Sequence, residues 1–186
     1  MFRPEIATAV ACFFLDKAPS HKLNDLALMK LMVISERQVL SESSAPLTGG
    51  SFFSMQNGPV LSEVLSLMKG TLVSPLWRSC IEFVSWDPES GVSNHCILRK
   101  MPDIEDYFSE FERQTLESVW EKYKDFSKWD VVNVTHAFPE WDKSVAVTKK
   151  TKPISLVTIF QHNLGLDASD ARARAEEIES LETLCG

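Results

Sequence analysis

The sequence predicts a mainly α-helical α+β fold, in which a compact helical domain carries a small antiparallel β element of two or three strands. Through most of the chain, apolar residues recur at three- and four-residue spacing, as on one face of a helix. Residues 80–86 alternate apolar and polar side chains, and a turn at 87–91 leads to a second such run at 92–98. This pattern is typical of a β-hairpin. Two strands alone are marginal in water, so the hairpin is expected to pack on helices, with the segment at Phe52 as a candidate third strand.

The first part of the chain is expected to form three helices. Ile6, Val10 and Phe14 mark a helix that ends near Pro19, and residues 22–40 form the next, which is long enough to be the spine of the fold. A loop at 41–50 and an extended run at 51–56 follow. Asn57-Gly58-Pro59 is then expected to open a helix over residues 59–69 that ends at Gly70, because Pro favours the first helical turn and Gly the position after the last.

The second part of the chain shows helix starts in its sequence. Ser109 is a candidate N-cap with Glu112 completing a capping box, and Ser127 begins a helix that runs to Phe138 and stops at Pro139. Residues 153–164 and the segment after Asp167 predict two more helices, the last with a thin apolar stripe. We therefore expect a helical domain over residues 1–143 and a C-terminal helical extension, 144–186, packed on the same domain.

Charge and composition narrow the classes of partner. The 186 residues carry a formal charge of −7, which disfavours nucleic-acid binding, because that binding depends on Lys and Arg. The short basic segment Lys149–Lys152 is therefore interpreted as a solvated loop, with a DNA-contacting regulator as the alternative. The four cysteines show neither a CxxC pair nor the spacing of a disulfide framework, which predicts a reducing cytoplasm. The apolar run from Ile6 to Leu15 is too short to span a membrane.

Motifs for catalysis or cofactor binding are absent from the sequence. There is no nucleophile elbow, phosphate loop, dinucleotide-binding turn or paired metal-ligand spacing, which predicts no catalytic residue, no metal and no cofactor. The alternative is a small hydrolase or transferase that uses His136 with Glu140 or Asp142. A structural histidine, hydrogen-bonded to backbone or carboxylate, is the competing interpretation.

Two further residues admit two interpretations each. Lys30 lies within the apolar stripe of its helix, so its amine either extends to the edge of the stripe or anchors a buried polar network. Trp141, which follows the Pro139 stop, is either a clamp over the helix end or an exposed anchor for a binding partner.

Several segments occur in an order that resembles a known family. They are Met29–Arg37, Pro46–Gly49, Met55–Ser62, Phe108–Glu110, Thr135-His136 and Pro139–Trp141. Over roughly residues 20–143 the chain resembles the Panacea domain, the SocA-like antitoxin family of bacteria and phages that includes phage-associated GepA-like proteins. The resemblance implies a cytoplasmic, mainly helical protein that neutralises a cognate toxin by direct binding, without catalysis. Some relatives instead deliver the bound toxin to an ATP-dependent protease.

The resemblance also marks residues for two roles. We expect partner binding at Asn57, Gly58, Pro59, His136, Glu140 and Trp141, and structural motif roles for Lys30, Arg37, Ser109 and Thr135. The expected partners are a protein toxin and, for an adaptor, a protease. The sequence does not decide between a monomer and a homo-oligomer, whereas membrane and nucleic-acid partners are not expected.

Overall fold

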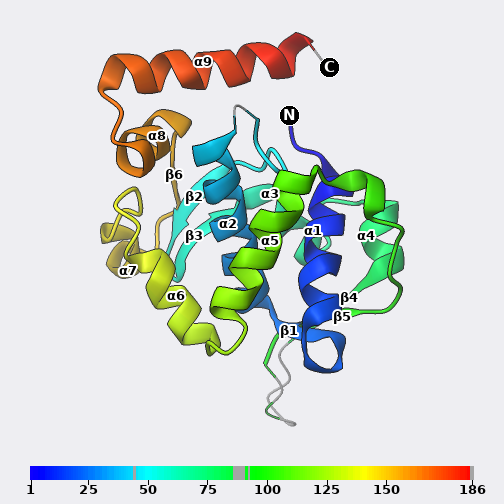
Figure 1. Cartoon of the computed structure of the whole chain (residues 1–186). Helices are drawn as coiled ribbons and strands as arrows, with labels where there is room; N and C mark the ends of the chain where they lie inside the picture. The colour runs from blue at the N-terminus through cyan, green and yellow to red at the C-terminus, as the bar shows by residue number, and fades with distance from the viewer. Residues whose placement is uncertain (44, 86–90, 92, 185–186) are drawn as a thin grey trace.

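Helix α2 (Asp25–Glu42) is the centre of the fold, and the other elements are arranged around it (Figure 1). The computed structural model describes every residue except 44, 86–90, 92, 185 and 186. Helix α2 contacts helices on several sides and strands from both sheets. The other helices are α1 (Pro4–Lys17), α3 (Ser62–Met68), α4 (Pro75–Cys80), α5 (Glu110–Tyr123), α6 (Lys128–His136), α7 (Ser144–Thr148), α8 (Leu156–Leu164) and α9 (Ala168–Leu184).

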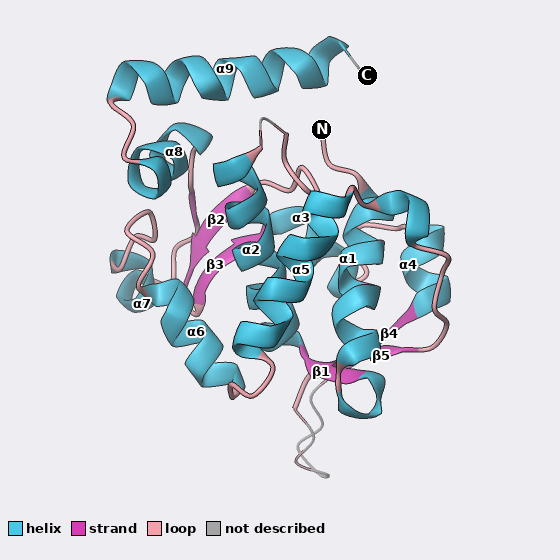
Figure 2. Cartoon of the chain, in the orientation of Figure 1, coloured by secondary structure: helices cyan, strands magenta, loops and turns pink. Residues whose placement is uncertain are grey.

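The strands form two small antiparallel sheets on different sides of α2 (Figure 2). One has the order β1-β5-β4, with β1 (Lys22–Asn24), β5 (His95–Leu98) and β4 (Ile81–Val84). The other has the order β3-β2-β6, with β3 (Gly58–Leu61), β2 (Phe52–Met55) and β6 (Lys152–Pro153). The mainly α-helical α+β fold is thus confirmed, and the β-hairpin pairs Ile81 with Leu98 and Val84 with His95. Its predicted turn lies outside the described residues except for Gly91.

The predicted third strand of the hairpin sheet is wrong. Phe52 pairs with Leu61 in the second sheet, whereas Leu23 in β1 pairs with Cys96 beside the hairpin. Residues 22–24 are therefore strand rather than the first turn of the spine helix. The helix begins at Asp25, where the Asn24 side chain accepts a hydrogen bond of 3.0 Å from the backbone N–H of Leu26. A local apolar pattern does not reveal this pairing with a strand about seventy residues away.

The predicted helix start at Pro59 is also wrong. Gly58 and Pro59 belong to β3, where Pro59 lies opposite Ser54, and the helix begins only at Ser62. Strand β3 is at the edge of its sheet, a position that tolerates a proline because one side of the strand needs no N–H donor. The end of this helix is confirmed. Gly70 has φ +71°, and the N–H groups of Gly70 and Thr71 bind the carbonyls of Leu67 and Ser66, as in a Schellman motif.

Capping boxes begin the two helices after the hairpin; the one at Ser109 was predicted, whereas at Ser127 only the helix start was. The Ser109 and Glu112 pair starts α5, and Ser127 with Asp130 starts α6. Helix α6 ends at His136 rather than Phe138. Helices α4 and α7 were not predicted, although Ser74-Pro75 is a good helix start, with the serine as N-cap and proline at the first position.

The C-terminal segments lie against the domain through β6 and α8. Strand β6 pairs with β2 and includes Pro153, so the predicted helix over 153–164 begins only at Leu156. Helix α9 crosses one end of the molecule above α8 (Figure 1). Its apolar stripe buries Ala171, Ala175 and Ile178, whereas Leu181, which belongs to the same stripe, is 47% exposed. No helix in the described part of the chain is long and apolar enough to cross a membrane. Cys12, Cys80 and Cys96 are buried free thiols, and Cys185 lies outside the described residues.

Candidate functional site

Segments far apart in the sequence meet at Gly58. This residue has φ +91°, and a Cβ atom added to it would lie 2.8 Å from Thr135 Oγ1, 3.0 Å from His136 Cδ2 and 3.1 Å from Lys30 Nζ. Only glycine accommodates both the positive φ and this close approach. The motif residues from α2, β3, α6 and the segment after α6 therefore form one cluster, which we call the Gly58 cluster: Lys30, Gly58, Pro59, Thr135, His136 and Trp141.

Lys30 anchors this cluster from within α2. Its side chain is fully buried, and Nζ donates a hydrogen bond of 2.6 Å to the carbonyl oxygen of Pro59. Burial lowers the pKa of Lys30 from its ordinary 10.5 to about 7, because a charged amine loses solvation there. The structure thus supports the buried anchor rather than an amine that extends to the edge of the helix stripe.

His136 stacks face to face on Trp141, with ring centroids 3.9 Å apart and an interplanar angle of 3°. The Trp141 indole N–H donates to the carbonyl of Met55, and only 7% of this residue is exposed. The interpretation of Trp141 as an exposed anchor is wrong, because the ring closes over the end of α6. Burial, followed by the nearby Lys30 charge, lowers the pKa of His136, and its Nε2 atom is buried without a hydrogen-bond partner.

Arg37 and Glu140 form a largely buried ion pair beside the cluster. Arg37 Nε lies 2.5 Å from Glu140 Oε1, and the side chains are 17% and 3% exposed. The guanidinium also lies over the Phe138 ring, 4.3 Å from its centroid. Glu140, expected to bind a partner, is therefore buried and already paired within the chain.

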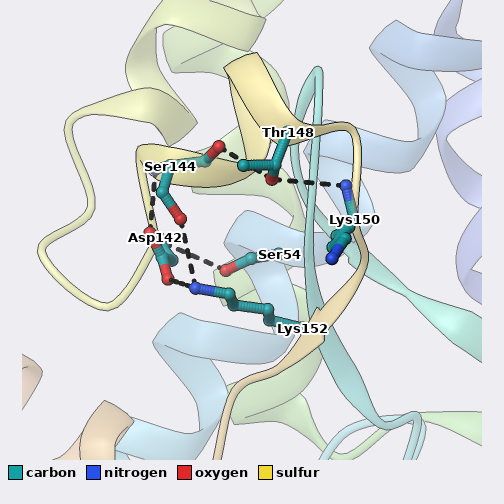
Figure 3. Close-up of polar contacts among 6 residues, drawn as sticks. All are labelled: Ser54, Asp142, Ser144, Thr148, Lys150 and Lys152. Carbon is teal, nitrogen blue, oxygen red and sulfur yellow. Dashed lines mark hydrogen bonds and ion pairs between the residues drawn. The ribbon is translucent and has the colours of Figure 1, made fainter.

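Asp142 ties the segment after Trp141 to β2 and β6 (Figure 3). Its backbone N–H donates to Ser54 Oγ at 3.1 Å, and its carboxylate accepts hydrogen bonds from Lys152 Nζ and from the backbone N–H of Ser144. These bonds lower the pKa of Asp142 to about 2. Lys152 therefore belongs to a structural ion pair rather than to a free basic segment. Among the described residues, His136 makes no hydrogen bond to Glu140 or Asp142, which does not support a catalytic pair with either.

Glu36 is a second buried polar group that the sequence did not reveal. It is fully buried, and its Oε2 accepts hydrogen bonds from the backbone N–H and the hydroxyl of Thr48 at 2.7 and 2.6 Å. Burial raises the pKa of Glu36 despite these bonds. The contact joins the motif segment of α2 to the loop before β2. An acidic residue in the helix, together with a threonine in the loop that follows the helix, is the sequence signal that could have indicated it.

A cleft of about 560 Å³ opens beside the Gly58 cluster. It lies between the start of α2, the β2–β3 turn, the end of α3 and the start of α6. Asn57 and Gln56 contribute exposed side chains at the turn, and Trp129, 53% exposed, stands at the α6 side. A volume of this size is typical of a ligand or peptide side-chain pocket.

The residues expected to bind a partner are therefore brought close together, but most of them are buried. Gly58, Pro59, Glu140 and Trp141 lie in the interior, His136 is half-buried, and Asn57 is exposed. Of the residues given structural roles, Lys30, Arg37 and Thr135 lie in or beside the cluster, whereas Ser109 caps α5. Trp129, an exposed aromatic that lines the cleft, was not among the residues expected to bind a partner. Within the described ranges, no three His, Cys, Asp or Glu side chains are grouped so that they could hold a metal ion.

Comparison with protein families shows a match over the middle of the chain. The model of the family described as antitoxin SocA-like, Panacea domain, matches residues 28–142, which is more than half of the chain. The matched range begins in α2 and ends at Asp142, so it includes the whole Gly58 cluster. Neither the curated proteins nor the solved structures show a match.

Proposed function

The chain belongs to the SocA-like antitoxin family defined by the Panacea domain, and from this premise we propose that it neutralises a cognate protein toxin by binding it directly. The observation that carries the proposal is the coincidence of the family match with the Gly58 cluster and its cleft. The matched residues build the buried Gly58 cluster, and Trp129, which is exposed beside it, is of a residue type that dominates the binding energy of protein interfaces.

We further propose that the chain performs no catalysis of its own. Glu140 is held by Arg37 and Asp142 by Lys152, so both acids considered as catalytic partners of His136 have structural partners. The His136 ring is covered by Trp141. This arrangement favours a structural role for the histidine, because a general base needs a reacting group within hydrogen-bond reach.

Growth rescue tests the antitoxin proposal. The protein encoded by the neighbouring gene is expressed from an inducible promoter, with or without this chain, and colony formation is counted. Rescue together with a stable complex in size-exclusion chromatography is the expected result. If the neighbouring protein is toxic and this chain neither binds nor suppresses it, the proposal is wrong for that pair.

A matched pair of aromatic substitutions locates the binding surface. Trp129→Ala removes the exposed tryptophan at the cleft, whereas Phe126→Ala removes an aromatic that is 44% exposed and does not line it. We expect Trp129→Ala to weaken the complex by about 2 kcal/mol and Phe126→Ala to leave it nearly unchanged. Equal effects of the two substitutions would place the interface elsewhere.

Direct inhibition and delivery to a protease are separated in cells that lack ATP-dependent proteases. We propose direct inhibition as the main mode. Rescue should then persist in those cells, and the purified chain should inhibit the purified toxin. Rescue that disappears with one protease, together with accumulation of the toxin, would instead identify the chain as an adaptor.

A further inference from the structure

We propose that the cleft beside the Gly58 cluster binds an acidic segment of the toxin, with a carboxylate against its lysines and an apolar side chain on its methionine floor. This inference rests on the proposed function and specifies the chemistry of the partner. It assigns a class of ligand to the cleft, whose exposed side chains lie outside the buried Gly58 cluster.

The cleft is basic in a chain whose formal charge is −7. Its lysines come from different parts of the fold, namely α2, the end of α3, the start of α6 and the residue after α7: Lys30, Lys69, Lys128 and Lys149. Asp25 is the acidic residue of the lining, and its two oxygens already accept hydrogen bonds, one from the backbone N–H of Leu26 at 2.8 Å and one from Asn94 Nδ2 at 3.1 Å. Because several lysines face a single aspartate, the local charge of the cleft is positive.

No carboxylate in the described part of the chain forms an ion pair with these lysines. Lys69 and Lys149 are exposed, and Lys128 lies over the Trp129 ring with Nζ 5.4 Å from its centroid. Like charges around a concave surface raise the local concentration of an oppositely charged partner. They also disfavour basic segments, which gives the cleft specificity for an acidic partner.

The floor of the cleft is apolar and adaptable. It is formed by Leu26, Met29, Met55, Val60, Leu65 and Met68. Methionine side chains fit partners of differing shape because they are unbranched and polarisable. Trp129 at the edge offers a large face to an incoming side chain, so a Leu, Phe or Trp next to an acidic residue matches both parts of the cleft.

Lys30 lies behind the wall of the cleft, with a fully buried side chain. An ammonium group has three N–H donors, and among the described residues the carbonyl of Pro59 is its hydrogen-bond acceptor. Because this amine is fully buried, a ligand carboxylate meets the exposed lysines of the cleft instead, and a charge-assisted hydrogen bond to these is stronger than one between neutral groups.

A peptide library displayed on phage tests the proposal and does not require the toxin itself. Random dodecapeptides are selected on the immobilised full chain, and the enriched sequences are synthesised with a fluorescent label for anisotropy titrations. We expect enrichment of Asp or Glu beside a large apolar residue, and an affinity that falls as salt rises, because exposed charges are screened.

Charge reversal at the cleft supplies the decisive comparison. The double variant Lys69→Glu with Lys149→Glu should weaken peptide binding at least about tenfold, since two attractive charges become repulsive. The control, Lys100→Glu with Lys122→Glu, makes the same change in net charge at exposed lysines that do not line the cleft, and should bind within about twofold of the parent chain. Free glutamate in excess should not displace the peptide, because it lacks the apolar contact.

The proposal is overturned if the selected peptides are neutral or basic, if none is enriched, or if both double variants bind equally. It is overturned as well if free glutamate competes fully, because the site would then take a small anion. Growth rescue is scored separately for each variant. Rescue without cleft-dependent peptide binding would leave the antitoxin proposal intact, while cleft-dependent binding without rescue would uphold the ligand chemistry and remove the antitoxin role.

Discussion

Gly58 is the residue on which the packing of three segments depends. It combines a positive φ with contacts to Thr135, His136 and Lys30 that leave no space for a Cβ atom. The side chains of Lys30 and Thr135 are themselves fully buried, so they have little freedom to move aside. A Cβ methyl group at this position would strain the positive-φ backbone and would also crowd the neighbouring core atoms.

We predict that Gly58→Ala lowers the free energy of unfolding by about 3 kcal/mol or more, from positive-φ strain together with overpacking. Urea denaturation followed by tryptophan fluorescence measures the change. Gly70→Ala is the matched control, because Gly70 has φ +71° but no atom within 4 Å of an added Cβ, and it should cost only about 1 kcal/mol. Similar losses for the two variants would show that crowding at Gly58 is unimportant.

The buried amine of Lys30 predicts a dependence of stability on pH. Its pKa is lowered from 10.5 to about 7 in the folded chain, so between these values the unfolded state binds more protons than the folded state. Stability from this group therefore rises as pH increases from 7 towards 10.5. Between pH 7 and 8.5 we expect a gain of about 1.5 kcal/mol. The pKa of the neighbouring His136 is lowered below 6.5, so its titration lies outside this interval.

Lys30→Met should abolish that gain, because methionine has a similar shape and no titrating group. The comparison is the difference between unfolding free energies at pH 7 and 8.5 for the parent chain and the variant. Lys100→Met, at an exposed lysine, should retain the pH dependence of the parent chain. An unchanged pH dependence in Lys30→Met would mean that the amine keeps an ordinary pKa in the folded state.

At the scale of elements, α9 is a helix with one main neighbour in the fold. It packs mainly on α8, with Ala171, Ala175 and Ile178 buried, and Arg174 donates a hydrogen bond of 2.9 Å to the carbonyl of Ser43. Because its contacts with the rest of the molecule are few, we expect α9 to open locally before the domain unfolds.

Ile178→Ala should weaken the docking of α9 by about 2–3 kcal/mol, since the residue is 2% exposed and its truncation leaves a cavity. Amide hydrogen exchange of α9 measures this loss, while the urea midpoint of the remaining domain should change little. Leu181→Ala on the same helix, at a residue that is 47% exposed, should stay within about 0.5 kcal/mol of the parent. Equal exchange in both variants would argue against a docked α9.

At the scale of the whole molecule, the Arg37–Glu140 pair connects the central helix to the end of the matched family region across 103 residues of sequence. We expect the pair to matter for stability because each charge is matched by the other. A buried carboxylate without its partner is strongly unfavourable, whereas replacing both partners by apolar groups is often nearly neutral.

Arg37→Met is therefore predicted to destabilise the chain by about 3–5 kcal/mol, and the double variant Arg37→Met with Glu140→Leu to recover most of that loss. A double-mutant cycle in urea denaturation gives the coupling between the two side chains. Independent, additive losses would show that the pair is not the link that the structure indicates.

Much of this molecule was accessible from local sequence. The apolar spacing of α1 and α5, the Ser109 and Ser127 caps and the Gly70 termination were all predicted, because residues within a few positions of one another create these features. The ordered motif segments pointed to the family that the matched range then showed. The role of those segments in partner binding stays a prediction.

Tertiary contacts decided the remainder. Pro59 lies in a strand because β2 pairs with it, Lys30 is buried because β3 and α6 close over α2, and Trp141 turns inward to reach His136 and Met55. The basic cleft likewise exists only because lysines from separate elements meet around one apolar floor. Helix spacing and caps are short-range properties that sequence expresses directly, whereas burial and strand pairing depend on residues that come together only when the chain folds.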